Sequence, residues 1–537
     1  MSHHDAAAAS ATGTARRAAH PTLILMLIAG AQLMVILDAT IVNIALPSMA
    51  HYFDKTQTDM TWALNAYTLA FGGLLLIGGR SGDILGRKRM FIIGLVLFSA
   101  GSFLGGIAPT YELLLAGRVV QGVGGAIASP TALSLITVAF AEGKERNRAF
   151  GVYAAVSGAG AALGLLLGGV LTEYLDWRWV LFVNVPIGLA LIAGAVVYLQ
   201  ETERLQGGFD IVGALLSVAG MVGLVYGFIN AANHGWGDSI TIGVLIASIV
   251  LLGAFVAWEM HTPDPMMPLR IFANRSRSGA YLVMLVIGAG MFGMFYFLTF
   301  FVQGVLGFSA LKAGIAFLPV SAVVIVGSGI VAQLMPRFGP KPLIVVGAIL
   351  MTISLYFYAT VSADSTYANK ILPGMLILAA GMACIFVPLT SVAVAKIRAE
   401  DTGLASALLN VGQQVGGSIG LSVLATVAAT SGRNSGNSHV AELSQKAQSG
   451  EGGVTQTTLD HFLELLKSQN SGALPSKTAT GDSVALRAFN EVQAHSASMG
   501  FLTAAIMGTV AVAVAIFLIN VKKSDVPTNP NELVGAH

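Results

Sequence analysis

Long uncharged stretches recur along almost the whole chain, and they limit its possible folds more than any other feature. Segments such as Phe91 to Ala108 and Ala190 to Leu199 carry no charged residue. A helix needs ~20 mostly apolar residues to cross the ~30 Å hydrocarbon layer, because it rises ~1.5 Å per residue. The runs are continuous rather than alternating, which favours helices over a transmembrane barrel. The sequence therefore predicts an all-α integral membrane protein.

The composition supports this fold class. Of the 537 residues, 55% are hydrophobic and 10% are charged, whereas soluble domains carry ~25% charged residues. The net charge of +2 does not suggest nucleic acid as a partner, and we expect none. The single cysteine, Cys384, lies in an apolar run, so we expect neither an intramolecular disulfide nor a metal site.

The sequence predicts fourteen spans, of which the last two are Thr402–Thr430 and Ser498–Val521. With the N-terminus inside, the inner segments hold nineteen Lys and Arg residues. The short outer loops hold four, which are Lys55, Arg178, Lys312 and Lys370. Lys and Arg accumulate in cytosolic loops of membrane proteins. We therefore expect a multi-pass protein with both termini in the cytosol.

The span pattern divides the chain into five parts. We predict a cytosolic tail (1–20), a six-helix bundle (21–200), two extra linker helices (201–260), a second six-helix bundle (261–521) and a cytosolic tail (522–537). Segment 431–497 of the second bundle is rich in Ser, Gly, Asn and Gln. We expect this segment to be an extracellular loop that buries little surface. Its amphipathic piece, Leu459–Leu466, could cover the outer mouth as a lid.

A glycine pattern indicates an internal repeat. Three glycines spaced four apart on the fifth span recur 252 residues later on the thirteenth, as Gly160, Gly164 and Gly168 against Gly412, Gly416 and Gly420. The connections after the second and tenth spans also match, with Gly86 and Gly339 in corresponding places. Repeated halves are typical of secondary transporters.

Two charged residues lie well away from the ends of predicted spans, Asp38 in the first and Arg118 in the fourth. A charge at the membrane centre costs ~2.5–3.5 kcal/mol, so such residues usually face a cavity or a partner. A carboxyl group in such a place can take up and release a proton. We interpret Asp38 and Arg118 as proton-coupling residues. The alternative is structural, with Asp38 bonded to helix backbone and Arg118 clamping helices together.

The connection 79–89 combines an acid, turn glycines and a basic cluster. It contains Gly79, Asp83, Gly86, Arg87 and Lys88. The preference of basic residues for the cytosolic side explains the cations but not the acid or the glycines. Such a loop can lock adjacent helix ends through charge-assisted hydrogen bonds. We interpret it as a cytosolic gate motif.

This gate motif resembles the loop motif of the major facilitator superfamily. Residues 118–124 resemble the superfamily's fourth-helix motif, whose arginine is implicated in proton coupling. Residues 37–47 are similar to the first-helix motif of the fourteen-helix drug:proton antiporters (EmrB/QacA type). Residues 177–188 and 306–314 are typical of the same branch. The resemblance covers nearly all of the chain outside the tails and segment 431–497, and it extends to actinobacterial antibiotic exporters and mycobacterial efflux pumps.

The resemblance implies the major facilitator fold, with two six-helix bundles and two extra central helices. It also implies proton-coupled export of hydrophobic or cationic drugs across the bacterial cytoplasmic membrane by alternating access. The partners would be these substrates, protons and membrane lipids, with a proton gradient in place of a cofactor. A lipid or lipid-like metabolite exporter of the same fold is the alternative.

The fifth span carries the antiporter helix motif of this branch with one departure. Gly160, Gly164, Gly168 and Gly169 match it, but Leu165 stands where the motif usually has proline. The glycines permit close helix packing. Without proline, the sequence does not predict whether this helix bends as the motif helix would.

Further polar and aromatic residues within the spans are candidates for lining a substrate cavity. They are Asn43, Asn65, Tyr67, Gln121, Tyr153, Phe295, Asn410, Gln413 and Gln414. For each one taken alone, helix packing or lipid contact is the simpler explanation. The chain has no Walker, Gly-x-Ser-x-Gly or His-Glu-x-x-His sequence, so we do not expect an enzyme. It also has no pore-lining repeats of like charge, which argues against a channel.

Overall fold

The computed structural model describes residues 21–140, 144–201, 208–395, 402–449, 453–471 and 481–521. Within these residues the regular secondary structure is helical throughout, which confirms the all-α prediction. The predicted tails 1–20 and 522–537 lie outside the described residues.

The first bundle follows the predicted order of spans. Its helices are α1 (Pro21–Phe53), α2 (Gln57–Leu85), α3 (Arg87–Gly106), α4 (Tyr111–Ala139), α5 (Lys144–Tyr174), α6 (Trp179–Phe182) and α7 (Asn184–Tyr198). The sixth predicted span is therefore divided between α6 and α7, with Val183 between them. A linker pair follows, formed by α8 (Ile211–His234) and α9 (Ser239–Glu259).

The second bundle begins after the strap 260–274, which contains the short helix η1 (Leu269–Ala273). Its helices are α10 (Arg275–Gly304), α11 (Ala310–Phe338), α12 (Pro340–Tyr358), η2 (Tyr367–Ile371), α13 (Leu372–Val394), α14 (Thr402–Ser449), α15 (Gln456–Ser471) and α17 (Ser483–Phe517). In the described part of the chain, thirteen helical stretches are long and apolar enough to cross a membrane, with α6 and α7 counted together. Helix α5, whose apolar part Gly160–Tyr174 is shorter, brings the number into agreement with the fourteen predicted spans.

The two halves repeat each other in their turns and in their packing. Gly86 and Gly339 end α2 and α11 with φ of 105° and 77°, a backbone conformation that favours glycine. Both glycine triples face the first helix of their own half. A β-carbon on Gly164 would lie 2.9 Å from the Leu37 carbonyl oxygen of α1, and one on Gly416 would overlap α10 at Leu285. The predicted repeat is confirmed.

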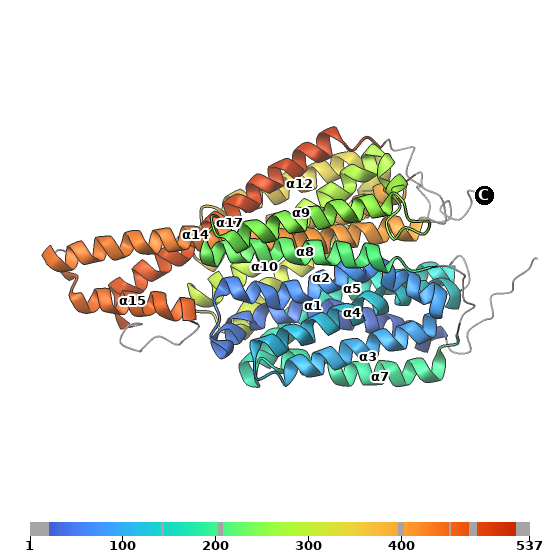
Figure 1. Ribbon diagram of the computed structural model, residues 1–537, viewed down its shortest axis with the longest axis horizontal. Coiled ribbons are helices and arrows are strands. Elements are labelled where there is room, and N and C mark those ends of the chain that lie inside the picture. Colours follow the sequence, from blue (N-terminus) through green and yellow to red (C-terminus); the bar gives the residue numbers. More distant parts are fainter. Residues whose placement is uncertain are drawn as a thin grey trace, which may run out of the picture.

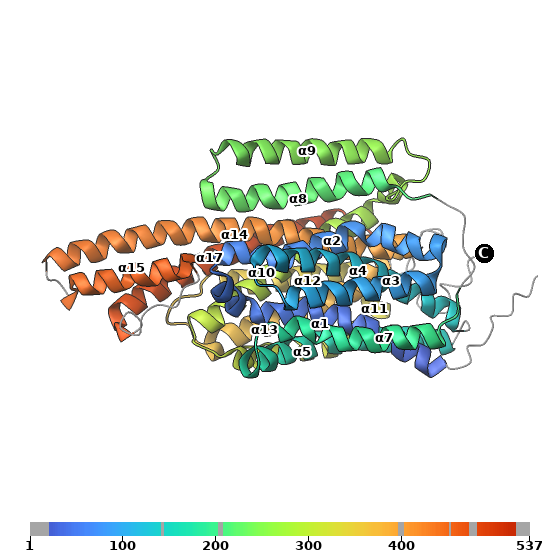
Figure 2. The same cartoon turned by 60° about the horizontal axis from the view of Figure 1, so that its bottom comes forward.

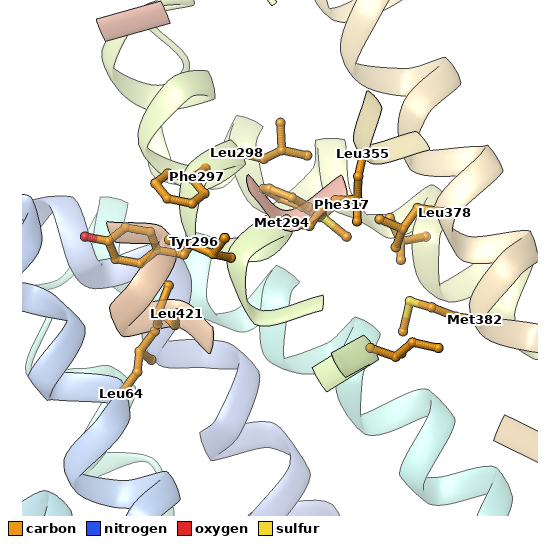
Figure 3. Close-up of a cluster of buried hydrophobic side chains, with 14 of the residues drawn as sticks. Leu64, Met294, Tyr296, Phe297, Leu298, Phe317, Leu355, Leu378, Met382 and Leu421 are labelled. Atoms are coloured by element: carbon orange, nitrogen blue, oxygen red, sulfur yellow. The ribbon is translucent and has the colours of Figure 1, made fainter. Parts of the chain in front are cut away.

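The hydrophobic core crosses from one bundle to the other. Figure 3 shows Leu64 of α2 and Leu421 of α14 beside Tyr296 of α10. The Tyr296 hydroxyl also donates to the backbone carbonyl of Gln57, at the start of α2. The bundles are therefore joined by apolar packing near the end of the molecule where α2 begins.

The prediction of a loop at 431–497 is wrong. Helix α14 continues to Ser449, α15 covers the amphipathic piece, and α17 begins at Ser483. These parts form a helical extension that projects away from the bundles (Figure 1). Ser, Gly and Asn suggested a loop, but apolar residues recur at helical spacing and form a separate core: Leu443, Val454, Leu459, Phe462, Leu465, Ala485, Ala488 and Val492. Because α15 packs against α14 and α17, the predicted lid over the outer mouth is also wrong.

The extension gives the bundles two distinguishable ends. The extension end carries the short connections with Lys55, Arg178 and Lys312. The opposite end, here called the basic end, carries Arg80, Arg87, Lys88, Arg89, Arg337 and Lys341. Helices α12 and α17 diverge from α3 and α7 toward the basic end (Figure 1). The linker pair lies along one side of the molecule, with α8 against α2 and α14 and α9 outside it (Figure 2).

Candidate proton-coupling site

Asp38 and Arg118 meet inside the first bundle. The Arg118 guanidinium donates to Asp38 Oδ2 at 2.6 Å, and the side chains are 1% and 0% exposed. Arg118 also donates to the Ala63 carbonyl of α2 at 3.0 Å, and its guanidinium lies 4.5 Å from the centre of the Tyr67 ring. The structure thus brings together the two charged residues that the sequence predicts. It also shows that Asp38 is not bonded merely to its own helix.

Two amide side chains hold the other oxygen of Asp38. Gln121 donates to Asp38 Oδ1 at 2.8 Å, and Asn184 donates to the same atom at 3.0 Å. Gln121 also accepts from Arg118 and donates to Ser102 of α3. The carboxylate is therefore surrounded by donors from α4 and α7, each fully buried.

Asn184 and Ser102 are site residues that the sequence did not identify as such. Asn184 is the first residue of α7, directly after the break at Val183. Asn184 lies in the segment 177–188 that resembles the antiporter branch, but the resemblance gave this residue no role of its own. Ser102 lies in the middle of α3, and serine in a span is too common to single out. In the structure Gln121 belongs to this network, although we predicted it as a cavity residue.

The network balances one negative charge with one positive charge in a buried place. A buried pair needs further hydrogen bonds to offset its desolvation, and here the two amides supply them. Protonation of Asp38 would remove the charge that Arg118 compensates, so the ion pair would weaken. A change in the charge of Asp38 would therefore alter the contacts among α1, α4 and α7.

The glycines of α5 place Asp38 by allowing α5 close to α1. A β-carbon would lie 3.1 Å from Leu33 at Gly160, 2.0 Å from the Thr40 hydroxyl at Gly164 and 2.8 Å from the Ile41 carbonyl at Gly168. The contact sites on α1 therefore flank Asp38 on both sides. Gly169 instead faces α11, where a β-carbon would lie 2.7 Å from Leu311 Cα. With Leu165 in the proline position, α5 is one continuous helix.

The gate motif lies at the basic end and links several helix ends. Arg87 donates to Asp83 Oδ1 through two nitrogens, at 3.1 and 2.8 Å. Lys88 donates to the carbonyl oxygens of Val196 and Leu199 at the end of α7.

A carboxylate that the sequence did not single out completes the motif. Glu201 accepts from the backbone nitrogens of Lys88 and Arg89 at 3.1 Å each, so it caps the start of α3. A β-carbon on Gly86 would lie 2.7 Å from this carboxylate. Gly79 packs against Pro130 of α4. The motif residues therefore lie together at the ends of α2 and α3, and their role as a gate stays a prediction.

Two predicted cavity residues lie in buried contacts. Asn65 of α2 donates to the Ser422 hydroxyl of α14 at 3.0 Å, and its side-chain oxygen is buried without a partner. Nearby, the hydroxyls of Thr68 and Ser418 lie 2.5 Å apart. Tyr67 is buried beneath Arg118. The contacts of Asn65 and Thr68 connect the two bundles, and Tyr67 packs against the Asp38–Arg118 network.

The other predicted cavity residues are distributed over both bundles. In the first bundle, Asn43 donates to the Ala39 carbonyl of its own helix, and the Tyr153 hydroxyl donates to Gln32 at 2.6 Å. In the second bundle, Phe295 packs on Phe317, Gln413 lies beside Met291, Gln414 has a buried unpartnered side-chain oxygen and Asn410 is exposed. Their role in binding a substrate stays a prediction.

Direct contacts between the bundles occur at the extension end. Gln303 of α10 donates to the Ile44 carbonyl of α1 at 3.0 Å. The backbone nitrogen of Leu311 in α11 donates to Glu173 of α5 at 2.8 Å. Close contact of Gly169 with Leu311 supports the same junction. The two bundles are thus closed against each other at this end and diverge toward the other.

Comparison with known proteins provides independent information on the family. The sequence profile described as Major Facilitator Superfamily matches residues 28–421. The puromycin resistance protein pur8 of Streptomyces alboniger is 42% identical over 74% of this chain and 80% of its own length. The cephamycin export protein CmcT of Amycolatopsis lactamdurans is 37% identical over 78% of this chain and 87% of its own length. The uncharacterized MFS-type transporter EfpA of Mycobacterium tuberculosis is 36% identical over 74% of this chain and 75% of its own length.

A solved structure supports the fold. A bacterial homologue of the human lysosomal transporter Spinster, in an inward-facing and occupied conformation, aligns with a TM-score of 0.65. The alignment covers 94% of this chain and 98% of that one at 16% sequence identity. At this identity the likeness concerns the fold alone.

Proposed function

Because the chain belongs to the Major Facilitator Superfamily, we propose that it exports hydrophobic or cationic drugs or antibiotics by proton-coupled alternating access. The relatives named for puromycin resistance and cephamycin export support drugs as the class of substrate. The observation that carries the proton coupling is the buried Asp38–Arg118 pair with its amide donors. A transmembrane potential supplies ~2.3 kcal/mol per 100 mV for each net charge that the cycle moves across the membrane.

The proposed orientation places the basic end in the cytosol of a bacterium and the extension outside its cytoplasmic membrane. The many cations at the basic end support this orientation. In this orientation the contacts of Gln303 and Leu311 close the outer side, and the divergence of the bundles faces the cytosol. The structure would then correspond to the state that receives substrate from inside.

In the proposed coupling, proton binding and release at Asp38 accompany the change between the state open to the outside and the state open to the cytosol. Protons enter when the site is open to the outside, neutralise Asp38 and weaken its bond to Arg118. Release to the cytosol restores the ion pair. Substrate moves outward in the opposite half of the cycle. The proton gradient supplies the energy for this movement in place of a cofactor.

The test is accumulation of a fluorescent cationic dye, and of puromycin, in cells with and without the protein. An uncoupler should abolish the difference. Asp38→Asn should abolish energised efflux while the protein still inserts into the membrane. Asp176→Asn, an exposed aspartate paired with Arg178, is the matched control and should behave as wild type. Uphill efflux that persists in Asp38→Asn would contradict the proposal.

A further inference from the structure

The base of the linker pair holds two carboxyl groups that the proposed transport cycle does not use. Asp210 caps the start of α8, and Glu259 is the last residue of α9. They are 8% and 4% exposed, although both lie at helix ends beside connecting segments. Burying an ionised carboxylate without compensation is costly. Their surroundings therefore need an explanation.

Each carboxyl group uses only one of its oxygens. Asp210 Oδ1 accepts from the backbone nitrogen of Gly213 at 2.8 Å and from the indole of Trp258 at 2.7 Å. Glu259 Oε2 accepts from the backbone nitrogen of Met267 in the strap at 3.0 Å. Asp210 Oδ2 and Glu259 Oε1 are buried and have no hydrogen-bond partner.

The two unpartnered oxygens point to the same place. A β-carbon on Gly213 would lie 2.3 Å from Asp210 Oδ2 and 2.9 Å from Glu259 Oε1. Both oxygens therefore border the small space beside the glycine. Two carboxylates this close do not both ionise in a buried place, because their like charges repel. In the described residues no third metal-binding side chain joins them to form a group of three.

We propose that Asp210 and Glu259 share one proton and form a titratable site separate from Asp38. The proton lies between Asp210 Oδ2 and Glu259 Oε1, so one carboxyl group donates to the other carboxylate. The pair then carries a single negative charge, and both buried oxygens are satisfied. Loss of the proton leaves two negative charges and removes the hydrogen bond.

Few charged side chains from packed elements reach this region. Arg80 comes from α2, and the strap carries His261, Asp264 and Arg270. Helix α14, which also packs on α8, has its described charged residues only from Arg433 onward, toward the extension end. No cation within the described packing partners is bonded to the unpartnered oxygens, so a proton is the simplest compensating charge.

The pair is adjacent to a contact of the gate motif. Arg80 donates to the Gly208 carbonyl at 3.2 Å and lies 3.8 Å from Asp264 in the strap. Gly208 precedes Asp210, and Asp264 follows Glu259. Repulsion between the ionised carboxylates would separate the ends of α8 and α9, so it would also move both partners of Arg80. Loss of the proton would thus loosen the attachment of the first bundle to the strap.

The test is the thermal stability of the purified protein between pH 6 and pH 9, in an Asp38→Asn background that removes titration of the central site. The shared proton binds the folded state more tightly than the unfolded chain, so its stabilisation is present at low pH and lost as the pH rises. We expect the apparent Tm to fall by about 2 °C or more across this range. Glu259→Gln places a permanent amide donor beside Asp210 and should keep the Tm of pH 6 at pH 9. Glu442→Gln, an exposed glutamate in the extension, is the control and should keep the wild-type fall.

An equal fall in Glu259→Gln and in the parent would overturn the proposal. So would recovery of the Tm at pH 9 by sodium or potassium ions in the parent but not in the variant, because a metal cation would then occupy the site. If Glu259→Gln does not fold, Asp210→Asn serves the same comparison, since its amide can donate to Glu259. These readouts do not depend on transport, so they stand or fall separately from the proposed export function.

Discussion

At the scale of single residues, the molecule concentrates its intramembrane polarity around Asp38. Three side chains donate to one carboxylate: Arg118, Gln121 and Asn184. Hydrogen bonds to a charged group contribute about 1.5–3 kcal/mol each. A change to any one donor should therefore alter the balance between the ionised and protonated forms of the site.

Asn184→Val should lower the rate of uphill efflux about 10-fold, because it removes one charge-assisted donor from Asp38. The measurement is dye efflux from energised whole cells over a range of external pH. Asn233→Val, at an exposed position near the end of α8, is the control. A wild-type pH profile in Asn184→Val would show that this amide has no part in coupling.

Asp83→Asn should weaken the gate at the basic end and slow turnover several-fold, because the ion pair between Arg87 and Asp83 is lost. Accessibility of engineered cysteines in the interior to an impermeant label, in a Cys384→Ser background, measures the gate. Glu442→Gln breaks a salt bridge of the same i, i+4 spacing with Lys446 in the extension and should have no effect. Identical labelling in Asp83→Asn and wild type would refute the gate interpretation.

At the scale of helices, close packing of α5 on α1 sets the position of Asp38. Gly164→Ala should reduce transport strongly, because its β-carbon would lie 2.0 Å from the Thr40 hydroxyl and 2.9 Å from the Leu37 carbonyl. Overpacking of this kind costs about 1–3 kcal/mol. Gly253→Ala on α9 is the matched control, because a β-carbon there would have no atom within 4 Å apart from the nearby turns of its own helix. Comparison of efflux at equal expression decides the outcome, and equal activity of the two variants would contradict it.

The sequence predicted helices well and their ends poorly. Apolar runs predicted the spans because a membrane demands about 20 such residues in a row. Segment 431–497 was mispredicted because its helices are short on apolar residues, and only contact among Leu443, Phe462 and Val492 makes them a packed unit. Asp38 and Arg118 were found because charge is rare in spans. Asn184 was not, because its role depends on a neighbour 146 positions away.

At the scale of the whole molecule, the extension has a hydrophobic core of its own and continues from α14 and α17. Its core residues do not belong to the cores of the bundles. Phe462→Ala should destabilise the extension by about 3–5 kcal/mol, because Phe462 is fully buried. Trypsin should then cut near Lys446 or Arg487 much faster, while efflux changes little. Val484→Ala, at an exposed position, is the control. Complete loss of efflux in a well-inserted Phe462→Ala protein would show that the extension is required for transport.

Helix α14 runs for 48 residues without an assigned break, from the second bundle into the extension. At 1.5 Å per residue it is a rod of about 70 Å. Because one end of this rod is fixed in the second bundle, a small tilt of that bundle produces a larger displacement at Ser449, the other end. In the proposed orientation that displacement occurs in open water outside the cell. A pair of dyes, one on the tip of the extension and one on the first bundle, would therefore turn the transport cycle into an optical signal without touching the interior of the transporter.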